Sequence, residues 1–141
     1  GTATIIMSGQ TEHALLSVAD DDYVGTTIHP TIEAMTARKQ WIANQLQVVG
    51  KLYLDAGASG VLNSGGASLL AVGVTSVDGD FQRGDLVACM NNDGQEIARG
   101  LINYSAAETR QIMGKSSQDI EGILGYVDES ELIHRDNLAL I

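Results

Sequence analysis

The stretch "GDFQRGDLVACMNNDGQEIARG" (residues 79–100) predicts a β-hairpin and so indicates the fold class of the chain. Residues 85–90 alternate between two sets of side chains, which is typical of a strand. Asp93-Gly94 is a strong hairpin-turn signal, because glycine adopts the positive φ that such turns require. Residues 96–104 alternate again and form the predicted return strand. We therefore expect a mainly β fold with short helices, of the α+β class.

The same stretch contains Arg83-Gly84-Asp85, the tripeptide that cell-adhesion ligands display. It lies between two predicted strands, at the entrance to the second one. A turn explains these residues: Gly84 adopts the turn conformation, Asp85 helps to close it, and Arg83 is solvated. We therefore interpret the tripeptide as a structural turn and reject an adhesion role.

Segments on both sides of the hairpin predict further strands and short helices. In "KLYLD" (51–55), leucines alternate with polar residues, which indicates a half-buried strand. Residues 56–66 form one or two helical turns before a glycine pair, and residues 68–79 lead into another strand. Residues 131–141 form a last strand or a pair of short strands. Together they predict a small mixed barrel with helices packed on its open ends.

Capping signals predict two helices after the hairpin. Ser105 and Glu108 form a capping box that opens the first helix, and Gly114 ends it. Ser116 or Ser117 caps the next one. Its inward-facing residues are expected to be Ile120, Ile123 and Leu124, followed by Gly125 as terminator.

A longer helix is predicted over residues 32–46, with Gly50 ending it. Arg38 and Lys39 lie on or near its polar side. Its apolar side is expected to contain Met35, Ile42 and Leu46.

The first part of the chain predicts one strand and one helix. Residues 2–9 are an apolar run that indicates a buried strand, and residues 11–19 show helical spacing. Residues 20–31, which contain three consecutive aspartates and the only proline, are expected to be an exposed connection. Consecutive carboxylates do not converge on one ion without help, so we favour a solvated loop over a metal site.

Charge and cysteine content limit the possible functions. The net charge is −10, and residues 34–141 hold thirteen acidic and eight basic side chains. Such a chain is a poor general nucleic-acid binder, because phosphate affinity depends on clustered Lys and Arg. Cys89 is the only cysteine, so the fold needs no internal disulfide. Without a recognisable signal peptide or membrane span, we expect a cytoplasmic protein that does not bind membranes.

Possible catalytic motifs in the sequence have simpler structural explanations. "GKSS" (114–117) resembles the end of a P-loop, but the first glycine of that motif is replaced by Thr109, and a helix precedes it. The three histidines show no metal-ligand spacing, and Cys89 has no activating partner. In "LIHRDNL" (132–138) we favour a turn or an Arg135–Asp contact over a ligand site. We therefore expect no catalytic, cofactor-binding or metal-binding residues.

Six motifs follow one another along the chain: "ARKQWIA" (37–43), "DAGA…L…GGASLL…GV" (55–74), "GDFQRGDLV" (79–87), "DGQEIARGLINYS" (93–105), "GKSSQDIEGILGY" (114–126) and "IHRDNL" (133–138). In this order and spacing they resemble the C-terminal part of bacterial glutamate 5-kinases. The resemblance implies a PUA-type β pseudo-barrel over residues 37–141. It also implies a linker at 29–36 and, at 1–28, a strand-helix remnant of an α/β amino-acid-kinase domain.

The resemblance also implies a function. Enzymes of that family transfer the γ-phosphate of ATP, with Mg²⁺, to the side-chain carboxylate of glutamate in the first step of proline synthesis. Their nucleotide and glutamate sites lie upstream of the matched region, so we expect this chain to be a regulatory or assembly module without its own cofactor. Its expected partners are the kinase domain of the same chain and further copies of itself.

The alternative is an RNA-binding PUA module with weak affinity. Cationic side chains would supply the contacts to RNA or to another ligand. The candidate contact residues are Arg38, Lys39, Lys51, Lys115 and Arg135.

Overall fold

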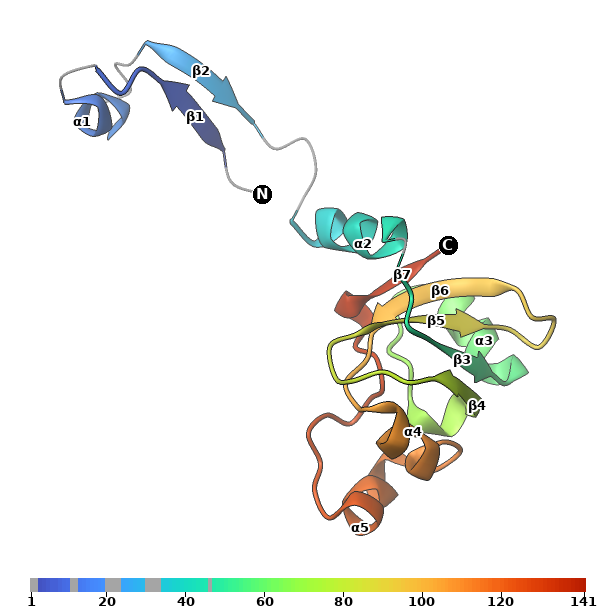
Figure 1. Cartoon of the computed structure of the whole chain (residues 1–141). Coiled ribbons are helices and arrows are strands. Elements are labelled where there is room, and N and C mark those ends of the chain that lie inside the picture. The colour runs from blue at the N-terminus through green and yellow to red at the C-terminus, as the bar shows by residue number, and fades with distance from the viewer. Residues whose placement is uncertain (1–2, 11–12, 20–23, 30–33, 46) are drawn as a thin grey trace. The chain divides into compact units, whose positions relative to one another are not determined.

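The computed structural model describes residues 3–10, 13–19, 24–29, 34–45 and 47–141. The chain divides into two compact units, Gly1–Ala37 and Arg38–Ile141, which we describe separately (Figure 1).

The first unit contains a two-stranded antiparallel sheet. Strands β1 (Thr4–Met7) and β2 (Gly25–Ile28) pair along their whole length, and helix α1 (Ala14–Ala19) lies between them in sequence. The strand and the helix expected here are confirmed, but the strand is not buried as predicted, because alternate residues of β1 are exposed and Ile6 is 57% exposed. The connection expected over residues 20–31 contains a strand that was not predicted, because the β-branched run Thr26–Ile28 pairs with β1. Most of this strand is exposed, as expected. The three aspartates of that connection lie outside the described residues.

The second unit is built on a five-stranded sheet in the order β4-β3-β5-β6-β7. Only β3 and β5 are parallel, and the other neighbours are antiparallel. The sheet and the short helices confirm the α+β class. The strands are β3 (Gly50–Leu54), β4 (Val74–Gly79), β5 (Leu86–Met90), β6 (Glu96–Leu101) and β7 (Leu138–Leu140).

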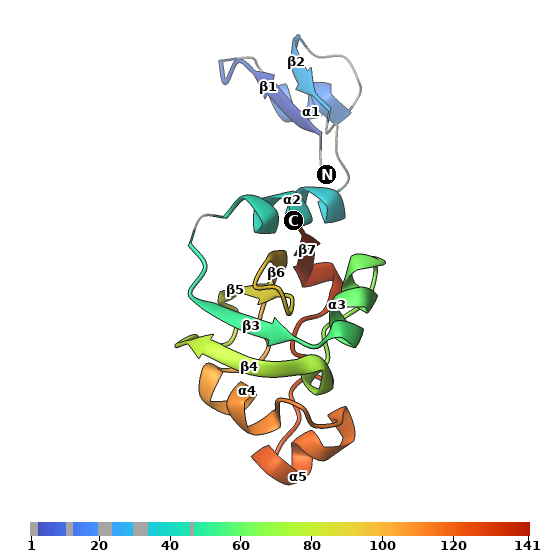
Figure 2. The same ribbon diagram turned by 90° about the vertical axis from the view of Figure 1, so that its right-hand side faces the viewer.

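Four helices accompany the strands. In both views α4 lies beside β4, and α5 lies next to α4 on the side away from the sheet (Figures 1 and 2). Helix α3 contacts β3 and β6. Single 3₁₀ turns occur at Ala71–Gly73, Ser117–Asp119 and Arg135–Asn137. The helices are α2 (Ala34–Asn44), α3 (Ala56–Asn63), α4 (Ala106–Ile112) and α5 (Ile120–Leu124).

The predicted hairpin forms the centre of this sheet. β5 and β6 pair antiparallel, and Gly94 in the turn has φ +75°. Residues 86–89 are all buried, because both faces of β5 are covered. Val87 and Cys89 pack into the main core, while Leu86 packs against Ile42 of α2 on the other face. The turn signal of the hairpin is local, but the burial of β5 depends on segments that lie far away in the sequence.

The helix caps are confirmed in detail. Ser105 and Glu108 form the complete capping box of α4, and Gly114 after it has φ +73°. Ser116 accepts a hydrogen bond from the amide of Gln118, and Gly125 ends α5 in the left-handed conformation.

Two details of the predicted helices are wrong. Ile123 is 37% exposed, because only one side of the short α5 faces the core. α2 ends at Asn44, and Gly50 begins β3 instead of ending the helix. On the predicted apolar side of α2, Ile42 is fully buried. Leu46 lies outside the described residues.

The Arg83-Gly84-Asp85 segment is a turn, as predicted. Gly84 has φ +86°, and its amide donates to the carbonyl of Ile102 at 2.7 Å. A carboxylate oxygen of Asp85 accepts from the amide of Gln82 at 2.8 Å. Arg83 is not simply solvated, because its guanidinium forms an ion pair with Asp128. Asp128 lies more than forty positions after Arg83 in the sequence, so the local pattern around Arg83 does not predict this ion pair.

Candidate functional site

A pocket of about 270 Å³ brings two of the predicted contact residues together. Lys39 of α2 and Arg135 of the last 3₁₀ turn both line it. The remaining lining residues are apolar or lack a polar side chain: Leu62, Gly65, Gly66, Ala67, Leu138 and Leu140. The pocket is thus a small apolar hollow with two cations.

The wall that carries Arg135 is held by backbone pairing. The amide of Arg135 donates to Oγ of Ser68 at 2.9 Å. Next to it, Leu69 and Ile133 form an antiparallel bridge, and the amide of Leu132 donates to the carbonyl of Leu69 at 2.8 Å. The glycine turn after α3 and the segment before β7 are therefore tied together, so this side of the pocket is preorganised.

The wall that carries Lys39 is held by packing and by one arginine. Ile42, one turn after Lys39, is buried against Leu86 of β5 and Ala139 of β7. The guanidinium of Arg99 on β6 donates to the carbonyls of Ala43 and Gln45 and pairs with Glu96. Donors placed at a helix C-terminus satisfy carbonyls that lack a partner within the helix. The second half of α2 is therefore fixed on the sheet.

The two cations of the pocket differ in their surroundings. Lys39 is partly buried and forms no ion pair with any described carboxylate. The side chain of Arg135 is 60% exposed, and its Nε lies 3.8 Å from Oδ1 of Asp136. An exposed pair at this distance contributes little to stability. The guanidinium of Arg135 thus remains accessible to a ligand.

The other predicted contact residues do not join this pocket. Arg38 is exposed on α2, and Lys51 is exposed on β3 opposite Asp78. Lys115 is exposed between α4 and the Ser117–Asp119 turn. Of the five predicted cations, Lys39 and Arg135 line this pocket and the other three do not.

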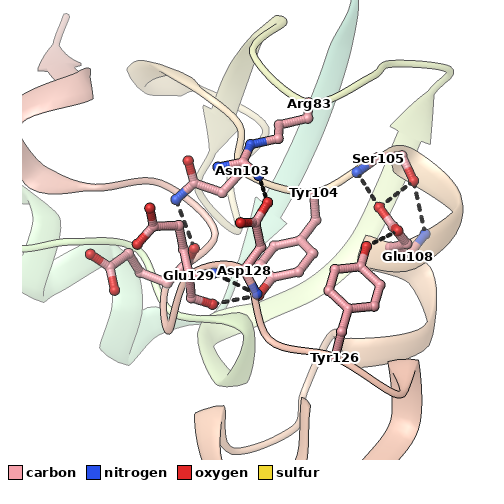
Figure 3. Close-up of polar contacts among 9 residues, drawn as sticks. Arg83, Asn103, Tyr104, Ser105, Glu108, Tyr126, Asp128 and Glu129 are labelled. Carbon is pink, nitrogen blue, oxygen red and sulfur yellow. Dashed lines mark hydrogen bonds and ion pairs between the residues drawn. The ribbon is translucent and has the colours of Figure 1, made fainter. Parts of the chain in front are cut away.

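A second polar cluster holds the segment between α5 and β7 (Figure 3). The hydroxyl of Tyr104, buried in the core, accepts from the amides of Asp128 and Glu129 and donates to the carbonyl of Glu129. Asp128 also pairs with Arg83. These contacts satisfy backbone groups of the segment, so the cluster is structural.

Tyr126 extends this cluster to the N-terminus of α4. Its hydroxyl donates to Glu108, whose other carboxylate oxygen accepts from the amide and the hydroxyl of Ser105 (Figure 3). The hydrogen bonds from Ser105 and then from Tyr126 hold the pKa of Glu108 below its usual range. Glu108 is therefore engaged as an ionised helix cap.

The described residues contain no group arranged for nucleophilic or metal chemistry. Burial raises the pKa of the Cys89 thiol to about 12, so it is an unreactive core side chain at neutral pH. No three His, Cys, Asp or Glu side chains in this part of the chain gather as metal ligands would. "GKSS" joins the end of α4 to the next 3₁₀ turn, as its capping residues predicted. None of the described helices is long and apolar enough to cross a membrane.

The family model of the PUA domain matches residues 50–124, which contain the first four strands of the five-stranded sheet and helices α3 to α5. The chain belongs to the PUA domain family. Among solved structures, a PUA domain from Aeropyrum pernix in complex with tartrate is 23% identical. The match covers 62% of this chain and 41% of that chain with a TM-score of 0.47.

Curated relatives match the whole chain. A glutamate 5-kinase from Thioalkalivibrio sulfidiphilus is 55% identical over all 141 residues, and one from Nitrosococcus oceani is 52% identical over the same length. The resemblance stated from the motifs is thereby confirmed. The chain spans 38% of the length of each of these relatives.

Sequence reasoning found the two cations of this pocket but not its walls. The sequence pattern predicts Gly65 and Gly66 only as the end of a helix, whereas in the structure both have positive φ and line the pocket. Leu138 and Leu140 lie in a predicted strand, but the sequence does not show which segments that strand contacts. The pairing of Leu69 with Ile133, which closes this side, leaves no local signal in the sequence.

Proposed function

We propose that this chain is the accessory PUA module of a glutamate 5-kinase. The observation that carries the proposal is 55% identity across all 141 residues to a relative of that name. In this assignment residues 1–28 belong to the amino-acid-kinase domain, residues 29–36 are a linker, and residues 37–141 are the PUA domain. The whole enzyme transfers the γ-phosphate of ATP to the side-chain carboxylate of glutamate, in the cytoplasm.

The module's role in this proposal is regulatory or structural. Phosphoryl transfer needs a phosphate cradle, cations that spread the developing charge and a pocket that aligns two substrates. ATP and Mg²⁺ would be held by the kinase part. The PUA module would contact that domain and support a homo-oligomer.

An activity comparison tests the proposal. Glutamate-dependent ADP release is measured with Mg²⁺ for this chain, for a full-length relative that carries it, and for that relative truncated after its kinase domain. We expect no turnover by this chain, and truncation should change proline inhibition or oligomeric state. Unchanged inhibition and assembly after truncation would contradict the regulatory role. Turnover by this chain that disappears in Lys115→Ala would show that "GKSS" binds nucleotide.

RNA binding is the second candidate, because Lys39 and Arg135 face one pocket. Few bases in an acidic chain leave little counterion release to drive binding. Structured RNA at physiological salt should therefore bind no more tightly than the roughly 10⁻⁴–10⁻⁶ M of non-specific complexes. Nanomolar affinity that is lost when Arg38 and Lys39 are both changed to Ala would favour the RNA function.

A further inference from the structure

We propose that the pocket of Lys39 and Arg135 binds a short aliphatic dicarboxylate. This inference concerns the pocket alone and does not depend on the kinase assignment.

The size of the pocket limits the ligand to a small molecule. Its volume of about 270 Å³ lies just below the roughly 300–1,000 Å³ of pockets for drug-sized ligands. A chain of four or five carbons with a carboxylate at each end fits such a hollow. An extended polymer would place only one of its monomers in a pocket of this size.

The two cations favour a ligand with two anionic groups. Lys39 and Arg135 come from separate elements, α2 and the 3₁₀ turn before β7, and both line the pocket. A guanidinium binds a carboxylate through two parallel hydrogen bonds, whereas an ammonium acts as a compact charge. One carboxylate on Arg135 and the other on Lys39 would neutralise both cations.

The apolar floor favours a carbon stem between those groups. Leu62 and Leu138 are almost fully buried below the pocket, and Leu140 is half-exposed at its edge. Methylene groups lose no hydrogen bonds when they contact leucine, whereas the oxygens of phosphate that face leucine would be left without partners. A dicarboxylate therefore suits the floor better than inorganic phosphate.

Glycines leave one side of the pocket open. Gly65 and Gly66 have φ +80° and +77°, and a Cβ at either position would meet no atom within 4 Å. Their backbones line the pocket without side chains that would fill it. Space for a ligand is thus part of the folded structure.

One nearby carboxylate competes with the ligand. Asp136 lies 3.8 Å from Nε of Arg135 and 3.5 Å from Nδ1 of His134. Removing its charge should release Arg135 for the ligand. Asp136→Asn is therefore expected to tighten dicarboxylate binding. Asp93→Asn removes the same charge in the distant hairpin turn and should not tighten it.

Titration calorimetry of this chain with succinate tests the proposal, with inorganic phosphate and chloride at matched ionic strength as comparators. We expect saturable succinate binding with a dissociation constant on the order of 1 mM. Lys39→Ala and Arg135→Ala should each weaken binding about tenfold, as expected for loss of a charge-assisted contact. Lys51→Ala and Lys115→Ala remove the same charge outside the pocket and should change binding less than about twofold.

Chemical-shift mapping on the unaltered protein gives a readout that needs no variant. Succinate should shift the amides of Gly65, Gly66 and Ala67 in a saturable way. No saturable shift at these amides, an equal loss in the Lys51 and Lys115 controls, or phosphate binding without succinate binding would each overturn the proposal. RNA binding that requires Lys39 and Arg135 while succinate does not bind would also overturn it.

Discussion

Gly50 and Phe81 are packed so closely that a Cβ atom on Gly50 would lie 2.3 Å from Cδ1 of the Phe81 ring. Phe81 is itself buried in the main core. Gly50→Ala must therefore displace a core aromatic ring, and we expect it to destabilise the fold by about 1–3 kcal/mol. Urea unfolding followed by circular dichroism measures the change.

The matched control for this substitution is Gly60→Ala. Gly60 lies inside α3, where a Cβ would meet nothing within 4 Å. Alanine there should stabilise the protein by roughly 0.5–1 kcal/mol, because it restricts the unfolded chain and suits a helix. Equal destabilisation by both substitutions would contradict the close packing of Gly50 on Phe81.

The hydroxyl of Tyr104 is expected to hold the segment between α5 and β7. Tyr104→Phe keeps the buried ring but removes the hydroxyl's three hydrogen bonds to Asp128 and Glu129. We expect a loss of about 1–2 kcal/mol in the free energy of unfolding. Limited proteolysis should cut the 126–131 segment faster in this variant. Tyr126→Phe removes one exposed hydrogen bond to Glu108 but none of the bonds to the backbone of the segment, so it should leave the cleavage rate closer to that of the unaltered protein.

The lowered pKa of Glu108 predicts a stability loss in acid. Hydrogen bonds from Ser105, and then from Tyr126, favour the carboxylate in the folded state. The folded chain therefore binds this proton less readily than the unfolded chain does. The stabilisation is complete above the ordinary glutamate pKa of roughly 4.3 and is lost as the pH falls through the lowered value.

Glu108→Gln isolates this contribution, because glutamine keeps the shape of the cap without a titrating charge. The unaltered protein should be the more stable of the two at neutral pH, and the difference should shrink as the solution is acidified below the glutamate range. Urea midpoints across this range measure it. A difference that stays constant with pH would show that the carboxylate is not engaged in the folded state.

Local signals explain which parts of this fold the sequence predicts. The Asp93-Gly94 turn and the Ser105–Glu108 box each act within a few residues, and both are present as expected. The parallel pairing of β3 with β5 instead brings together two strands that α3, a 3₁₀ turn and β4 separate in the sequence. The same holds for the ion pair of Arg83 with Asp128.

The candidate site shows the same division between local and distant information. Composition and charge identify Lys39 and Arg135 as available cations, but they identify Lys51 and Lys115 equally well. Only the packing of Ile42 on β5 and β7, together with the Leu69–Ile133 bridge, brings the first two to one pocket. Sequence patterns do not show which distant segments will contact one another in the fold.

The two units should differ in stability when studied in this chain. The second unit contains both hydrophobic clusters of the described residues. The described part of the first unit contains two four-residue strands and a short helix, and it exposes Leu15 at 85% and Val24 at 93%. A lone two-stranded sheet is marginally stable in water, whereas the five-stranded sheet has a core of its own.

We therefore expect a shortened protein of residues 34–141, which keeps α2, to unfold at nearly the same urea concentration as the whole chain. In the whole chain, the amides of Thr4–Met7 should exchange quickly with deuterium, while those of β5 should be protected up to the global unfolding free energy. A neighbouring copy that pairs with the open edge of β1 or β2 would raise the protection with protein concentration. Strong protection of Thr4–Met7 in a proven monomer would show that the first unit is stable by itself.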